Sequence, residues 1–69
     1  MSTYKIIELV GTSPNSWEEA ARSAVETASK SLKNLRVAEI TKLDMTMDES
    51  GKILLYRARV SVSFKYESE

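Results

Sequence analysis

The sequence predicts an α+β fold in which a first strand is followed by one helix and then by a long two-stranded hairpin. Three observations support this order. An apolar, β-branched run occupies Tyr4 to Val10, and a run of alanines with helical spacing follows it. Apolar and polar residues then alternate from Ile53 to Tyr66. We therefore expect a β-α-β-β protomer, a single domain over residues 1–69.

The first strand is expected to end at Gly11, which closes the apolar run YKIIELV. Successive side chains of a strand point to opposite faces, and both faces of this strand are largely apolar. Such a pattern is typical of a strand that is covered on both sides.

The stretch GTSPNSW, residues 11–17, holds the only proline and the only tryptophan of the chain. It is either a ligand-binding loop with an aromatic platform or a helix start. Ser16 and Glu19 form the S-x-x-E capping-box pattern, and we favour this start. Ser13 before Pro14 is a competing start one turn earlier. The apolar side chains that follow share one helix face; they are Trp17, Ala20, Ala21, Ala24, Val25, Ala28, Leu32 and Leu35.

The second strand is expected over Arg36 to Met47, where the apolar residues change from one parity to the other. This change indicates a bulge near Thr41 or Lys42, because one extra residue turns the following side chains to the opposite face. The sequence DESG, residues 48–51, predicts the hairpin turn. One face of the last strand is expected to meet the helix; it carries Leu54, Tyr56, Ala58, Val60, Val62, Phe64 and Tyr66.

Four large side chains in the hairpin have two interpretations. Tyr56 and Phe64 lie on the face that is expected to meet the helix, and we assign them to the core. Met45 and Met47 could line an adaptable apolar pocket, but we expect them to be packed.

The length of the chain favours oligomerisation. A domain of 69 residues buries only about 60% of its unfolded surface and is marginally stable alone. With no Cys and no His, neither a disulfide nor a zinc site of the usual ligands can stabilise it. The second face of the last strand combines Ile53 and Leu55 with two arginines, a mixture that suits a subunit interface. We therefore expect a homo-oligomer.

The composition argues against several classes of function. Lys and Arg total 10, as do Asp and Glu, and zero net charge argues against nucleic-acid binding. No apolar run approaches the ~20 residues of a membrane span, and no signal-peptide pattern is present, so we expect a soluble cytoplasmic protein. Without His or Cys, and with no serine spaced for activation, we do not expect an enzyme.

Three segments resemble the dodecin family: YKIIELVGTSPNSWEEAARSAVETASKSL, NLRVAEI and YRARVSVSF. The resemblance covers nearly the whole chain and depends on these segments occurring together at the right spacing. It implies a three-stranded antiparallel sheet partly wrapped around one helix, and a hollow dodecameric shell. It also implies storage or sequestration of flavins such as riboflavin or FMN, and often of coenzyme A, at subunit interfaces.

Two positions that the resemblance assigns to flavin binding are substituted. Val37 stands where the family has a tryptophan that stacks on the flavin ring, and valine offers no aromatic face. Arg57 stands where the family has a glutamine that hydrogen-bonds the ring edge, and arginine cannot accept from the ring N–H. The SPNSW segment and the Tyr56–Arg57 pair are similar to the tryptophan-less branch called calcium dodecins, which implies calcium binding. Flavin storage and a purely structural oligomer are the alternatives.

The segment LDMTMDESG offers oxygen ligands of the kind that calcium prefers. Asp44, Asp48 and Glu49 are the candidate metal ligands. Their spacing is not that of an EF-hand, and from the sequence alone we favour a solvated hairpin end over a metal site. Carboxylates of neighbouring copies, for instance Glu39 or Glu8, could complete a site.

Arg57 and Arg59 share one face of the last strand. They could form an anion site for a phosphate or a carboxylate. We favour ion pairs with Glu39 or Asp44, either on the adjacent strand or in another copy.

Overall fold

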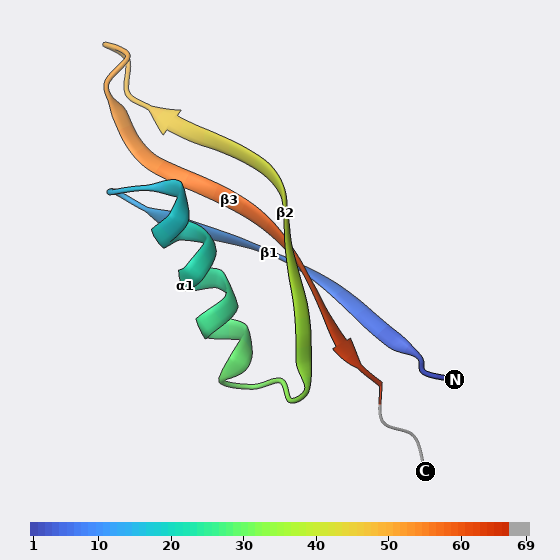
Figure 1. The fold of residues 1–69 in the computed structure, drawn as a ribbon. Coiled ribbons are helices and arrows are strands. Elements are labelled where there is room, and N and C mark those ends of the chain that lie inside the picture. Colours follow the sequence, from blue (N-terminus) through green and yellow to red (C-terminus); the bar gives the residue numbers. More distant parts are fainter. Residues whose placement is uncertain (67–69) are drawn as a thin grey trace.

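The computed structural model describes residues 1–66, which form three strands and one helix in the predicted order (Figure 1). The elements are β1 (Tyr4–Ser13), α1 (Trp17–Ser29), β2 (Leu35–Met47) and β3 (Ile53–Lys65). The strands form one antiparallel sheet in the order β1-β3-β2, so the last strand lies in the middle. The sheet is twisted and bends around α1 (Figure 1). The predicted β-α-β-β fold is confirmed.

The helix starts as predicted, with Ser16 as its N-cap. The Glu19 backbone N–H donates to Ser16 Oγ over 3.0 Å, which satisfies one of the free donors at the helix start. The Ser16 N–H, which a full capping box would pair with Glu19, donates to Ser13 Oγ instead. The Glu19 carboxylate accepts from the Ser13 hydroxyl and from the Asn15 amide. Ser13 therefore holds the turn together and does not start the helix.

The helix ends earlier than its apolar face predicts. Lys30 is the C-cap, and Asn34 adopts a left-handed backbone with φ 64°. Leu35 already belongs to β2, where it pairs with Phe64. The prediction that Leu32 and Leu35 continue the helix is wrong, because an asparagine that tolerates the left-handed conformation turns the chain into β2. No helix in residues 1–66 is long and apolar enough to cross a membrane.

The core lies between α1 and the part of the sheet formed by β1 and β3. Its fully or nearly fully buried side chains come from one stripe of α1 and one face of β3; they are Ala20, Ala21, Ala24, Ala58, Val60 and Val62. Small residues on both sides bring the helix close to the strands. The predicted helix-facing sides of α1 and β3 are thus confirmed at their centres.

Gly11 marks the closest approach of helix and sheet, and it does not end β1. A Cβ atom at Gly11 would lie 2.0 Å from the carbonyl oxygen of Ala20. Only glycine allows the two backbones to lie this close. The strand continues past Gly11 to Ser13, so the predicted strand end is wrong.

The predicted bulge in β2 lies at Thr41. Pairing with β3 shifts between Ile40 and Lys42, and the Thr41 hydroxyl donates to the Arg59 carbonyl over 3.3 Å. The bulge keeps the apolar residues of β2 on the α1 side, both before and after it. We call the opposite side of the sheet the open face; it carries Tyr4, Ile6, Glu8, Val10 and Thr12 of β1, Leu55, Arg57, Arg59, Ser61 and Ser63 of β3, and Val37, Glu39, Lys42, Asp44 and Thr46 of β2.

One helix leaves much of the sheet uncovered. On the open face, Ile6 and Val10 are 63% and 50% exposed, so β1 is not covered on both sides within one chain. On the α1 side of β2, Ile40 and Leu43 are 51% and 50% exposed. The radius of gyration is 14.4 Å, against about 11 Å for a compact chain of this length. The chain alone is therefore extended, with apolar surface on both sides of its sheet.

The methionines and aromatic residues of the hairpin are less buried than predicted. Met45, Tyr56 and Phe64 are only half-buried, and Met47 is 60% exposed. Tyr56 meets α1 through the ring of Trp17, and all four residues lie toward the ends of β2 and β3.

Candidate functional site

Arg57 pairs with Asp44 across β3 and β2 on the open face. Its Nε donates to Asp44 Oδ1 over 2.7 Å, and its Nη2 donates to Asp44 Oδ2 over 3.1 Å, which is a bidentate geometry. The hydrogen bonds from Arg57 hold the pKa of Asp44 below its ordinary value, and the charges of Arg59 and Lys42 add to this effect. The prediction of an ion pair with Asp44 on the adjacent strand is confirmed. In residues 1–66 it is the one ion pair formed, so Arg59 has not paired with Glu39.

Trp17 connects the start of α1 to the same part of β2. Its Nε1–H donates to the backbone carbonyl of Asp44 over 2.9 Å. Its ring packs edge-on against Tyr56, with ring centroids 5.1 Å apart and an angle of 74° between the planes. Trp17 therefore fixes the helix start against β2 and β3 and is not an open aromatic platform. The interpretation of residues 11–17 as a helix start is confirmed.

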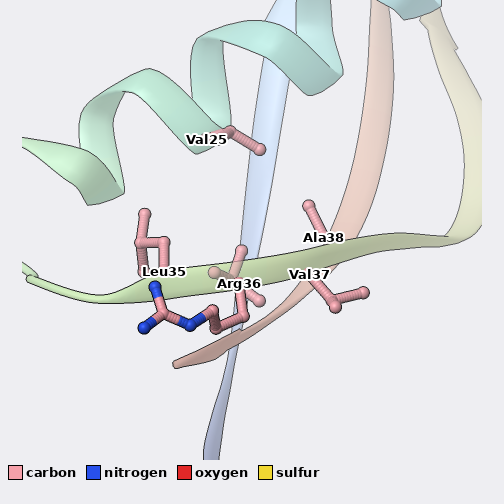
Figure 2. A pocket seen from close by; sticks show the side chains of 6 residues that line it. Val25, Leu35, Arg36, Val37 and Ala38 are labelled. Carbon is pink, nitrogen blue, oxygen red and sulfur yellow. The ribbon is translucent and has the colours of Figure 1, made fainter. Parts of the chain in front are cut away.

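Val37 lines a cavity of about 200 Å³ between α1 and the beginning of β2 (Figure 2). Figure 2 shows Ala38 directed toward α1 and Val37 directed away from it. The cavity is smaller than the ~300–1,000 Å³ of sites for drug-sized ligands. Among the described residues its lining includes no aromatic ring; it consists of Val25, Leu35, Arg36, Val37, Ala38 and Val62.

The two substituted flavin positions do not meet within one chain. Val37 pairs with Ser63 of β3, whereas Arg57 lies six residues earlier on that strand. Six residues of strand span about 20 Å. A single flavin ring, which is much shorter than this distance, could therefore meet both positions only where two copies come together.

Asp48 closes the hairpin turn. Its Oδ1 accepts from the backbone N–H groups of Ser50 and Lys52, each over 2.9 Å, and from the Ser50 hydroxyl over 2.8 Å. The Ser50 hydroxyl and these N–H groups lower the pKa of Asp48. Gly51 completes the turn with φ 88°, a left-handed backbone that favours glycine. The predicted turn is confirmed, and Asp48 has a structural role in it.

The three candidate metal ligands do not converge in one chain. Asp44 is held by Arg57, Asp48 Oδ1 is used by the turn, and Glu49 is exposed. Within residues 1–66 no group of three or more acidic side chains is placed to hold a metal ion. Since calcium takes six to eight oxygen ligands, a calcium site would need groups from more than one copy.

The strand register aligns charged side chains that the sequence shows only singly. Glu8 of β1 and Glu39 of β2 both pair with Ser61 of β3, and we call these three residues the acidic row. Arg59 of β3 is likewise flanked by Val10 and Lys42, and we call Arg59 and Lys42 the basic row. The two rows are adjacent on the open face. Sequence reasoning missed this alignment because it depends on the register and on the bulge at Thr41.

Comparison with known proteins identifies the relatives of the chain. The family model described as Dodecin matches residues 3–67. The calcium dodecin of Mycobacterium tuberculosis is 51% identical over 65 residues, which cover 94% of this chain and 90% of that protein. The dodecin of Thermus thermophilus is 36% identical over 64 residues, which cover 93% and 91% of the two chains.

Solved structures share the same fold. A Thermus thermophilus protein superposes with a TM-score of 0.89 at 33% identity, over 100% of both chains. The Mycobacterium tuberculosis calcium dodecin superposes with a TM-score of 0.84 at 47% identity, over 99% of this chain and 96% of that one. That relative is described as calcium chelating, with a novel calcium-binding site. The sequence and the fold together show that this chain belongs to the dodecin family.

Proposed function

We propose that this chain forms a non-enzymatic homo-oligomer, a dodecamer by family resemblance, that binds calcium at contacts between copies. The observation that carries the proposal is the bidentate Arg57–Asp44 pair. It occupies the position where the resemblance implies a hydrogen-bonding partner for a flavin. The 51% identity to a calcium dodecin supports calcium as the alternative ligand.

Two physical features weigh against flavin binding. Val37 has no aromatic face, so a stacking contribution of roughly 1 kcal/mol beyond area burial is lost. Arg57 could meet the ring carbonyls only by leaving the Asp44 carboxylate, and it could not accept from the ring N–H. Both changes disfavour a flavin ring in the family's position.

We place the calcium ligands at the end of the β2–β3 hairpin. The hydrogen bonds of the turn use Oδ1 of Asp48, which leaves Oδ2 for a metal, and Glu49 is exposed beside it. Asp44 is a weaker candidate, because calcium would have to displace Arg57. Carboxylates of neighbouring copies would supply the remaining ligands.

Thermal unfolding with added calcium tests this proposal. A ligand present at a hundredfold excess over its Kd stabilises the folded state by about 2.7 kcal/mol, so we expect a rise in Tm that EDTA reverses. The variant Asp48→Asn with Glu49→Gln should lose this rise. Glu18→Gln with Glu26→Gln, which also removes two negative charges, here from the exposed side of α1, should keep it.

Three results would contradict calcium binding at the hairpin, and each points to a different alternative. An unchanged Tm at millimolar calcium would contradict calcium binding and leave a purely structural oligomer. Quenching of riboflavin fluorescence by the wild-type protein would instead favour the flavin alternative. Loss of the calcium effect in Glu8→Gln with Glu39→Gln, but not in the hairpin variant, would move the ligands to the acidic row.

A further inference from the structure

Trp17 is the point at which the helix start holds the β2–β3 hairpin. Its Nε1–H donates to the backbone carbonyl of Asp44 over 2.9 Å, and its ring packs edge-on against Tyr56. Tyr56 of β3 pairs directly with Met45 of β2, the residue after Asp44. A single side chain of α1 thus contacts both strands of the hairpin at the same level.

Asp44 is fixed from both sides of the sheet at this level. The Arg57 guanidinium holds its carboxylate on the open face through two hydrogen bonds of 2.7 and 3.1 Å. Trp17 holds its backbone carbonyl from the α1 side. The ion pair joins β2 only to β3, whereas the indole bond joins the hairpin to the helix. A change at Trp17 can therefore alter how the hairpin is held without removing any carboxylate.

The turn from which Trp17 projects is itself anchored to β1. Ser13, at the end of β1, is only 3% exposed. Its hydroxyl accepts from the Asn15 backbone N–H over 2.9 Å and donates to the Glu19 carboxylate. Ser13 also pairs with Tyr56 in the sheet. The indole donor of Trp17 therefore holds β2 from a fixed position.

Beyond Asp44 the hairpin has little cover. Met47 and Leu54, near its end, are 60% and 49% exposed. Figure 1 shows the hairpin continuing past the start of α1. Asp48 follows Asp44 by four residues, about 13 Å of strand. The direction in which the end of the hairpin points thus depends on how β2 is held at Asp44.

A metal site that several copies complete needs each copy to present its ligands in a fixed direction. Such a site must hold its groups within about 0.5 Å of the productive geometry. A hairpin that moves by more than this must be ordered when the metal binds, and that ordering lowers the affinity. Fixing β2 at Asp44 before binding avoids this loss.

We propose that Trp17 is a positioning residue for the calcium site at the end of the hairpin. By holding the Asp44 carbonyl, it directs Asp48 and Glu49 toward the contacts with neighbouring copies. The inference rests on the proposed function and adds a residue that does not itself touch the metal. Because coupling between two events is reciprocal, bound calcium must strengthen the bond from Trp17 by the factor by which that bond strengthens calcium binding.

Trp17→Phe tests this role, because it keeps an aromatic ring beside Tyr56 and removes the N–H donor. We expect the calcium Kd, measured by titration calorimetry, to rise about fivefold, the factor that corresponds to one net hydrogen bond. Thr41→Val is the matched control: it also removes one hydrogen bond from a side chain to a backbone carbonyl, that of Arg59, but leaves the contact with α1 intact.

The control separates positioning from stability. Both variants should lower the Tm of the calcium-free protein by similar amounts, since each loses one hydrogen bond of the same kind. The Kd of Thr41→Val should stay close to that of the wild type. Equal calcium Kd values for Trp17→Phe and Thr41→Val would overturn the positioning role.

Hydrogen exchange of the indole N–H is a second measurement and uses the wild-type protein. The chain has one tryptophan, so its Nε1–H gives a single indole signal in an NMR spectrum. Saturating calcium should slow the exchange of this N–H by about fivefold. An exchange rate that bound calcium leaves unchanged would contradict the coupling.

The two proposals fail in different ways. If the wild type and Trp17→Phe bind calcium equally well, the proposed function stands and the positioning role fails. If the wild type does not respond to calcium, the calcium function fails, and exchange of the backbone amides of residues 45–55 tests the hold on the hairpin by itself. Faster exchange in Trp17→Phe than in Thr41→Val would retain that hold, and equal rates would remove it as well.

Discussion

The two halves of the sheet carry similar apolar residues but differ in how they are covered. Val60 and Val62 of β3 are 1% exposed beneath α1. Ile40 and Leu43 of β2 lie on the same side of the sheet and are 51% and 50% exposed. The 13 residues of α1 span about 20 Å, whereas the 13 residues of β2 span about 43 Å. Burial in this chain is thus decided by the position of the helix as much as by residue type, and the helix leaves the β2 half uncovered within one chain.

The largest expected effect is at the covered half, where Gly11→Ala should prevent the close approach of α1. The new Cβ would lie 2.0 Å from the Ala20 carbonyl oxygen, so the backbone must move. We expect a loss of about 3 kcal/mol or more in the free energy of unfolding by urea. Gly51→Ala, at φ +88° with open space around it, should lose only about 1 kcal/mol. A smaller loss at Gly11 than at Gly51 would show that the contact is not close.

The next effect compares the two halves directly. Val60→Ala removes buried methyl groups and should lower the free energy of unfolding by about 2–3 kcal/mol. Ile40→Ala, at a half-exposed position of β2, should cost less than about 1 kcal/mol in the dissociated chain and act mainly on association. Urea unfolding at low protein concentration, with light scattering beside it, separates the two effects. Equal losses in the dissociated chain would mean that β2 is already packed.

The smallest expected effect is on stability at acid pH and concerns Asp44, near the C-terminal end of β2. Arg57 lowers the pKa of Asp44 in the folded state, so the ionised carboxylate stabilises the fold. This contribution is complete above the ordinary pKa of 3.8 and is lost as the pH falls below it. We expect Tm to fall less between pH 5 and pH 3 in Asp44→Asn than in the wild type. Glu19 and Asp48, whose pKa values are also lowered, should keep part of the acid sensitivity in the variant. Identical falls would exclude a contribution from Asp44.

Local features of the fold could be predicted because each depends on a few neighbouring residues. Ser16 caps the helix through a bond three residues away, and Thr41 is revealed by a change of parity within one strand. The end of the helix could not be predicted, because the apolar spacing up to Leu35 is also satisfied by a strand that pairs with Phe64. Gly11 looked like a strand end, and its real role depends on the distant Ala20.

The site was predictable only as a set of alternatives. Arg57 had Asp44 and Glu39 as possible partners, and the register of β2 on β3 places Asp44 directly opposite it. The bond from Trp17 to the Asp44 carbonyl has no local signal, since it joins residues far apart in the sequence. The metal ligands remain a prediction, because groups from other copies would have to complete them.

The bulge at Thr41 decides which side chains in the rest of β2 face the helix and which lie on the open face. If β2 instead paired regularly through Thr41, without a bulge, Lys42 and Asp44 would turn toward the helix, and Leu43 and Met45 would turn outward. The basic row would disappear and Arg57 would lose its partner, although no charged residue had been changed. The bulge thus lets β2 accommodate one additional residue without moving these side chains, and deletion of Thr41, which would make Lys42 follow Ile40 in regular pairing, should leave them on the same face.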